Sequence, residues 1–231
     1  MQVTLLTHTG DPEQIVAAAA RLCYSPSNIT DITESLTPNK AAKFIAKLFA
    51  LGHESPFEHA VFTFGIEGVS RALTHQLVRH RMASYSQQSQ RYVDGGNFDI
   101  IIPDSIQSDE KALASFQNAI LQTQNVYKQL TELGVSKEDA RFVLPNASDT
   151  RIIMTANARS LFNFFKHRCC ARAQWEIKHL ADEMLRLVKQ VAPAIFECAG
   201  PSCLRGKCPE GEMTCGNLQV RMEYMGDAAN A

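Results

Sequence analysis

Apolar residues along the chain follow two spacings, which predict short strands and longer amphipathic helices. Phe62, Phe64 and Ile66 alternate with small or polar residues, and this pattern predicts a strand over 61–69 with one buried face. Similar patterns predict strands over 3–6, 98–102 and 151–157. Helical spacing predicts helices over 12–23, 38–51, 70–80, 109–133, 137–144, 158–168 and 173–191. Residues 25–36 are predicted to form a loop.

Local signals refine several of these helices. Asp11 and Gln14 around Pro12 resemble a capping box, Thr37 precedes Pro38 in the same way, and Ser70 is expected to cap the helix that follows it. The first helix is expected to bury Ile15, Ala18, Ala19 and Leu22. The long helix is expected to bury Leu113, Phe116, Ile120, Tyr127 and Leu130, and the last helix Trp175, Leu180, Met184, Leu187 and Val191.

The order of these elements limits the fold class. Strands and helices alternate irregularly, which favours an α+β or mixed α/β domain over a regular doubly wound sheet. The chain has no Gly-x-Gly-x-x-Gly after a strand and no Walker loop, so the usual dinucleotide and triphosphate fingerprints are missing. A cofactor would need another kind of site.

Composition and charge exclude several classes. The 231 residues are 45% hydrophobic and 20% charged, with a formal net charge of -1, which argues against a general nucleic-acid binder. The N-terminus does not resemble a signal peptide, and no apolar stretch reaches membrane-spanning length. We therefore expect a cytoplasmic protein that contacts no membrane, and its seven cysteines are expected to be reduced.

The candidate chemistry centres on residues 79–91. These thirteen positions hold three Arg, one His, three Ser and three Gln, a donor set that suits phosphates and heteroaromatic rings. Ser89 lacks a nucleophile elbow, so a binding hydroxyl is favoured over a nucleophile. His80 lies between Arg79 and Arg81 and is expected to act as a neutral donor or stacking partner, or as a base.

A second candidate element is the helix over 158–168. Arg159 and Asn163 lie one turn apart on one face, while Arg168 points about 140° away around the helix. One short helix is thus expected to contact two ligands. The His53 to His59 segment has two His and two Glu, but the two histidines do not share a helix face, and no metal site is predicted there.

Arg79-His80-Arg81 followed by seven residues and Ser89 resembles the signature of the flavin-dependent thymidylate synthases (ThyX). Segments 53–59, 141–145, 157–164 and 173–177 also resemble family segments in the same order. The resemblance implies an α+β single domain whose mixed or antiparallel sheet is flanked by long helices. It divides the chain into a catalytic domain over 1–200 and a Cys- and Gly-rich tail over 201–231.

The resemblance also implies a function. A homotetramer would hold FAD at its subunit interfaces and convert dUMP to dTMP, with methylenetetrahydrofolate as carbon donor and NADPH as reductant. The implied FAD-binding residues are His53, Arg79, His80, Arg81, Asn157, Arg159 and Asn163. The implied dUMP-binding residues are Gln76, Gln87, Ser89, Arg91, Arg141 and Arg168. Arg168 would stabilise negative charge on the pyrimidine and Ser89 would orient it.

Some features depart from the family pattern. Gln87 stands where some members have an acid, and Ser86 where Asn is frequent, so nearby dUMP contacts are open to the backbone. The tail adds Cys198, Cys203 and two further cysteines, whose intervals miss the paired spacing of common zinc sites; free thiols are favoured over zinc or disulfides. Two other functions stay open: another FAD oxidoreductase with a changed substrate, and a non-enzymatic nucleotide- or RNA-binding module.

Overall fold

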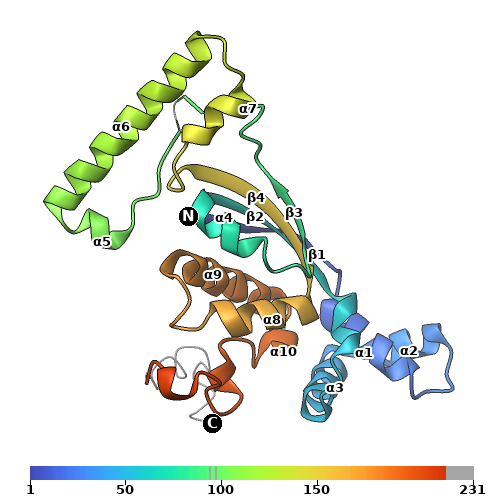
Figure 1. Ribbon diagram of the computed structural model, residues 1–231. Helices are drawn as coiled ribbons and strands as arrows, with labels where there is room; N and C mark the ends of the chain where they lie inside the picture. The colour runs from blue at the N-terminus through green and yellow to red at the C-terminus, as the bar shows by residue number, and fades with distance from the viewer. Residues whose placement is uncertain (94, 97, 217–231) are drawn as a thin grey trace. The chain divides into compact units, whose positions relative to one another are not determined.

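The computed structural model describes residues 1–93, 95–96 and 98–216 (Figure 1). The chain divides into two compact units, each built from several segments. Unit 1 contains Met1–Gln2, Ile66–Arg79 and Tyr85–Ile153. Unit 2 contains Val3–Gly65, His80–Ser84 and the chain from Met154 onwards. The predicted tail over 201–231 is described only as far as residue 216, so 217–231 lie outside the described residues.

An antiparallel sheet of four strands confirms the α+β class. Its strands, in the order β1-β2-β4-β3, are β1 (Gln2–His8), β2 (Val61–Ser70), β4 (Asp149–Asn157) and β3 (Ser84–Gln87). Phe62, Phe64 and Ile66 are fully buried, as their alternation predicted. Strands β2 and β4 contribute residues to both units.

The predicted strand over 98–102 is wrong, and the strand β3 was missed. Ile100 forms only an isolated bridge to Ser148. The Phe98 carbonyl accepts a hydrogen bond from the side chain of Gln124 rather than from the backbone of a neighbouring strand. The residues of β3 follow the Arg-His-Arg triplet, where no strand was predicted. Pairing at a sheet edge depends on contacts distant in sequence, which local spacing does not report.

Unit 2 holds most of the helices. They are α1 (Pro12–Leu22), α2 (Ile29–Ser35), α3 (Pro38–Leu51), α8 (Ala158–Arg168), α9 (Trp175–Val191) and α10 (Pro193–Phe196), with the short 3-10 helices η1 (Ser55–His59), η3 (Ser202–Leu204) and η4 (Gly211–Met213). Helix α1 packs against α2 and α3, and α9 packs against α8 and α10 (Figure 1). Phe57, Phe162 and Phe196 form ring contacts between η1, α8 and α10, with centroids 5.4–5.5 Å apart.

The first helix forms where predicted, but it turns a different face to the core. Ile15 and Leu22 are exposed, whereas Val16, Ala17 and Ala20 are buried. Asp11 adopts a left-handed conformation with φ of 43° and makes no side-chain cap, so the capping box is also wrong. The loop predicted over 25–36 contains α2, which packs on α1 and supplies part of the core that selects this face.

Other helix signals are confirmed. Thr37 caps α3, which ends at Gly52 in the left-handed region with φ of 70°. In α9, Leu180 and Met184 are buried as predicted, and Leu187 and Val191 are half-buried. Trp175 was wrongly assigned to the core: as the first residue of α9 it lies 45% exposed.

Unit 1 is built around one long helix. Its helices are α4 (Arg71–Leu77), α5 (Asp104–Gln107), α6 (Glu110–Glu132) and α7 (Lys137–Ala140), followed by the 3-10 helix η2 (Arg141–Val143). Ser70 caps α4 as predicted, although that helix is shorter than expected. Of the predicted stripe on α6, Ile120 and Tyr127 are buried and the other three positions are half-buried. In the part of the chain that is described, no helix has both the length and the apolar content to cross a bilayer.

Candidate active site

The junction between β4 and α8 in unit 2 brings three of the predicted flavin residues together. Asn157 ends β4 and caps α8, because its side-chain Oδ1 accepts a hydrogen bond from the Ser160 amide at 2.9 Å. Arg159 and Asn163 follow one turn apart, and both are exposed. These three residues line one pocket of about 1030 Å³. The helical spacing of 159 and 163 had predicted this shared face.

Arg159 is held by two carboxylates that sequence reasoning did not assign. Its guanidinium pairs with Glu54, where Nε lies 3.4 Å from Oε2, and with Glu58 through Nη1. The side-chain hydrogen bond to Glu58 raises the pKa of Arg159 above its ordinary value, so this group is a permanent cation. Glu54 and Glu58 belong to the His53–His59 segment, whose acidic residues were the available signal.

The same pocket offers both polar and apolar contacts. Lys166 and Arg205 add positive charge, while Met82 and Phe162 add apolar surface. Guanidinium and ammonium groups suit a pyrophosphate, the Asn amides suit a ring edge, and apolar side chains suit a planar ring face. The residues present therefore fit a flavin dinucleotide.

His80 lies next to α8 as a neutral hydrogen-bond donor. Its Nε2 is 2.8 Å from the Ser160 hydroxyl, and that hydroxyl donates its single proton to the Met82 carbonyl. His80 Nε2 must therefore carry the proton in this contact. Burial lowers the pKa of His80, and the positive charge of Arg168 lowers it further. The ring also meets Phe164 edge-on at 5.5 Å between centroids.

The remaining predicted flavin residues do not all join this pocket. His53 lines a different pocket of unit 2, with Tyr24, Phe44 and Lys47 among its neighbours. Arg79 and Arg81 are exposed, and Arg79 belongs to unit 1 whereas Arg81 belongs to unit 2. A single chain thus assembles part of the predicted set.

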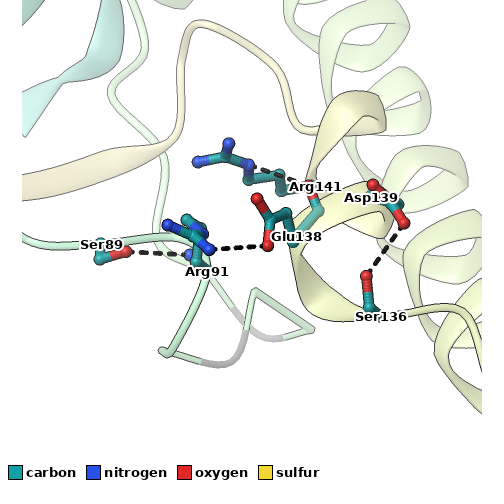
Figure 2. A network of polar contacts seen from close by, with 6 residues as sticks. All are labelled: Ser89, Arg91, Ser136, Glu138, Asp139 and Arg141. Carbon is teal, nitrogen blue, oxygen red and sulfur yellow. Dashed lines mark hydrogen bonds and ion pairs between the residues drawn. The ribbon is translucent and has the colours of Figure 1, made fainter.

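In unit 1, two of the predicted nucleotide residues contact the same residue, Glu138 (Figure 2). Arg91 Nη2 lies 2.9 Å from Glu138 Oε2, with both side chains about half exposed. Arg141 Nε donates to the Glu138 backbone carbonyl at 3.0 Å. Figure 2 shows both guanidinium groups beside Glu138, which was not predicted as a site residue. Glu138 therefore links the two arginines, one through its carboxylate and the other through its backbone carbonyl.

Ser89 is positioned by its neighbours. Its Oγ accepts a hydrogen bond from the Arg91 amide at 3.1 Å, which engages a lone pair and supplies no base to the hydroxyl. The preceding carbonyl of Gln88 accepts a 2.7 Å hydrogen bond from Arg71 Nη2. This geometry supports a binding hydroxyl over a nucleophile.

A small cavity of about 220 Å³ beside Ser89 contains two polar residues that sequence reasoning missed. Arg71 Nε and Asp149 Oδ1 line it, and both atoms are buried with no hydrogen-bond partner among the described residues. Burial raises the pKa of Asp149 and lowers that of Arg71. No local motif marks either residue, because the two come together only through folding.

One glutamine of the predicted set, Gln87, makes inward contacts. Gln87 Nε2 donates to the Thr74 hydroxyl at 2.9 Å and lies 3.4 Å from the Thr150 hydroxyl. Both threonines are buried. Gln76 is half-buried on α4. The Gln87 side-chain amide is therefore engaged with the protein interior.

Arg168, the last residue of α8, lies in unit 2 on a second pocket. That pocket is also lined by Lys166, His167 and segments of the tail between Pro201 and Gly216. It shares Lys166 and several tail residues with the pocket that contains Asn157. The tail therefore borders the candidate site, although the sequence placed it outside the catalytic domain.

The chain is similar to known proteins over most of its length. Residues 4–194 match the family described as "Thymidylate synthase complementing protein". The flavin-dependent thymidylate synthase of Geobacter sulfurreducens is 57% identical over 218 residues, which cover 94% of each chain. The flavin-dependent thymidylate synthase of Clostridium tetani is 51% identical, and the match covers 94% of this chain and 93% of the relative. That of Pyrococcus furiosus is 42% identical, and the match covers 92% of this chain and 91% of the relative.

Proposed function

Because the chain belongs to the family of flavin-dependent thymidylate synthases, we propose that it converts dUMP to dTMP with FAD as bound cofactor. Methylenetetrahydrofolate supplies the carbon in this proposal, and NADPH is the reductant. The observation that carries it is the pocket at the β4–α8 junction, where Asn157, Arg159 and Asn163 are grouped as the flavin assignment requires. The bound flavin supplies the hydride.

The flavin assignment extends to residues beyond this pocket. We assign His53, Arg79, His80 and Arg81 to FAD, in addition to the three residues of the pocket. His53 lies on another pocket of the same unit, which supports a flavin held between chains of a homotetramer. One chain would then contribute Arg159 and another His53.

The nucleotide assignment rests on cations and hydroxyls. Arg91 and Arg141 beside Glu138 would bind the dUMP phosphate, since guanidinium groups form two-point contacts with phosphate oxygens. Gln76, Gln87 and Ser89 would orient the nucleotide. Arg168 would face the uracil carbonyls and stabilise negative charge that develops on the ring. Ser89 and Arg168 are thus the residues proposed to act on the reacting base.

We further propose where the enzyme is located in the cell and where its catalytic domain ends. A cytoplasmic enzyme is consistent with reduced cysteines, all seven of which are free thiols in the structure. We propose a catalytic domain over 1–200 and a tail over 201–231, supported by the end of the family match at residue 194. Gly200, Pro201 and Ser202 line the flavin pocket, so the tail would contribute to the catalytic site.

Anaerobic turnover tests the function. The purified protein is incubated with dUMP, methylenetetrahydrofolate and NADPH, and dTMP is followed by chromatography. We expect dTMP to form only when all three are present, and the protein to be yellow and to release FAD on denaturation. A yellow protein that forms no dTMP would support an oxidoreductase with another substrate. A colourless protein that binds single-stranded RNA with steep salt dependence would support the binding module.

A further inference from the structure

Four cysteines from two distant segments line one pocket of unit 2. Cys170 follows the end of α8, while Cys203, Cys208 and Cys215 come from the tail. The pocket has a volume of about 720 Å³. Cys198 was grouped with the tail cysteines by sequence spacing, but it is exposed and is not among the residues that line this pocket. The four cysteines that line the pocket therefore include Cys170, which is distant in sequence, and do not include Cys198.

The tail is fastened at this place by contacts with the body of unit 2. Arg172 Nη1 donates to the Met213 carbonyl at 2.7 Å and lies 3.3 Å from Glu210 Oε2. Arg205 lies over the rings of Phe49 and Phe162, 5.4 and 5.3 Å from their centroids. These contacts lie on both sides of Cys208 in the chain, so several independent interactions keep this part of the tail at the pocket that Cys170 also lines.

The surroundings suit a bound cation with thiolate ligands. Cys170, Cys203, Cys208 and Cys215 line one pocket, so one ion there would have soft sulfur ligands available from both segments. Four thiolates and one divalent ion carry a net charge of −2. Lys166, Arg168 and Lys207 line the same pocket and would offset that charge.

We propose that Cys170, Cys203, Cys208 and Cys215 bind one zinc ion as a tetrathiolate site that fastens the tail to the end of α8. Thiolates are soft ligands, and a closed set of four is typical of structural zinc. Binding displaces the four thiol protons into solvent and changes no oxidation state. The site explains why the tail intervals do not match paired zinc motifs: the fourth ligand comes from a distant helix end.

The thiols share the pocket without forming a finished coordination shell. Within 1–93, 95–96 and 98–216, no three His, Cys, Asp or Glu side chains are already arranged to hold a metal. The tail cysteines must therefore turn toward Cys170 when the ion binds. All four lie in 3-10 or irregular segments, where a side-chain rotation disturbs no long helix or strand.

Such a site would act on the candidate active site through position alone. Pro201, Ser202 and Gly206 line both this pocket and the pocket that contains Asn157 and Arg159. Zinc would hold this shared wall in place and would keep the tail beside Arg168. It is a structural site and takes no part in the reaction.

The test measures metal content in the full-length protein. The protein is prepared with zinc and a non-chelating reductant, and is then dialysed and analysed for zinc, iron and sulfide. We expect one zinc per chain. Cys208→Ser and Cys215→Ser should lose most of the zinc, while Cys23→Ser and Cys198→Ser are matched controls at exposed cysteines and should retain it.

Alkylation of the unmodified protein provides a second measurement that needs no variant. Cys170, Cys203, Cys208 and Cys215 should resist alkylation until a strong chelator is added, whereas Cys23 and Cys198 should react at once. Zinc well below one per chain, iron with sulfide in its place, or disulfides among the four would each overturn the proposal. Equal loss of zinc from the two control variants would also overturn it.

Discussion

At the scale of single residues, two arginines of the candidate site, Arg91 and Arg159, are paired with carboxylates. Arg91 pairs with Glu138 and Arg159 with Glu54 and Glu58, and all of these side chains are about half exposed. Exposed ion pairs contribute only about 0–1 kcal/mol to stability. They therefore add little to the fold. Instead they hold the two guanidinium groups in place, and a phosphate that bound there would compete with the carboxylates.

His80 leads to a prediction about pH. Its folded pKa is lowered by burial and by Arg168, whereas an unfolded histidine has a pKa of about 6.5. The unfolded chain therefore binds the proton first as the pH falls. The contribution of His80 to the free energy of unfolding is fully present above the unfolded pKa and is lost as the pH falls through the lowered folded pKa.

His80→Gln keeps a side-chain donor and cannot titrate. We expect its urea midpoint to fall less than that of the unmodified protein between about pH 7.5 and about pH 5.5. His75→Gln, at an exposed position of α4, is the control and should behave like the unmodified protein. An identical pH dependence for the His80 variant would show that His80 is not a buried neutral donor.

Substitutions of Ser89 and Arg168 are expected to affect different quantities, turnover in the first case and dUMP affinity in the second. Ser89→Ala removes one hydroxyl contact to the nucleotide, so turnover should fall roughly threefold to tenfold without being abolished. Arg168→Ala removes a charged contact, and dUMP affinity should fall roughly tenfold to a hundredfold. Steady-state kinetics and equilibrium binding of dUMP give both values. Complete loss of turnover in Ser89→Ala with dUMP and flavin still bound would instead make Ser89 a nucleophile.

At the scale of elements, α8 organises the candidate site because its two ends serve different purposes. Its N-terminus carries Asn157 and Arg159 on the pocket proposed to bind the flavin, and its C-terminus carries Arg168 on the neighbouring pocket. Helical geometry alone predicted this division, since residues 163 and 168 differ by about 140° around the axis. The capping role of Asn157 was not predicted, and the same residue caps α8 and lines the pocket to which we assign the flavin.

The two roles of Asn157 can be separated by a matched control. Asn28 caps α2 as Asn157 caps α8, with its Oδ1 2.8 Å from the Asp31 amide. Asn157→Ala and Asn28→Ala should each lower the free energy of unfolding by about 1 kcal/mol. Only Asn157→Ala should also weaken FAD binding, measured by flavin titration. Equal FAD affinity in both variants would leave Asn157 with a capping role alone.

Element predictions failed where a neighbour distant in sequence selected among local options. In α1, Ala-rich sequence presents more than one plausible apolar face, and packing against α2 and α3 selected Val16, Ala17 and Ala20. For residues 98–102 the β-forming composition was correct, but a single bridge to Ser148 formed in place of a ladder. Burial and pairing depend on what lies opposite, and a window of one sequence does not contain that information.

At the scale of the whole molecule, the proposed tetramer makes a specific prediction. His53 and Arg159 are both assigned to FAD, yet they line different pockets within unit 2. If different chains contribute them to one site, His53→Ala and Arg159→Ala subunits can combine into an assembly with an intact site. Mixing the two defective variants under conditions of subunit exchange should restore FAD binding, and light scattering should give the mass of four chains.

Two controls accompany this mixing experiment. Arg159→Ala mixed with Asn163→Ala should restore nothing, because both residues line the same pocket of one chain. The unmixed variants, treated identically, measure recovery from handling alone. Failure of the His53 and Arg159 mixture, with subunit exchange demonstrated by mass, would place both residues in a site formed by one chain.

The sequence by itself determined the α+β class, the main strands and helices, and the family, because hydrophobic spacing, helix caps and the Arg-His-Arg segment are local features. It also indicated which face of α8 would carry each set of residues. Only the tertiary structure decided that Glu54, Glu58 and Glu138 hold the arginines, that Arg71 fastens the Gln88 carbonyl, and that Cys170 joins the tail cysteines. These residues are far apart in sequence, and their contacts arise because folding buries apolar surface and brings the attached polar groups together.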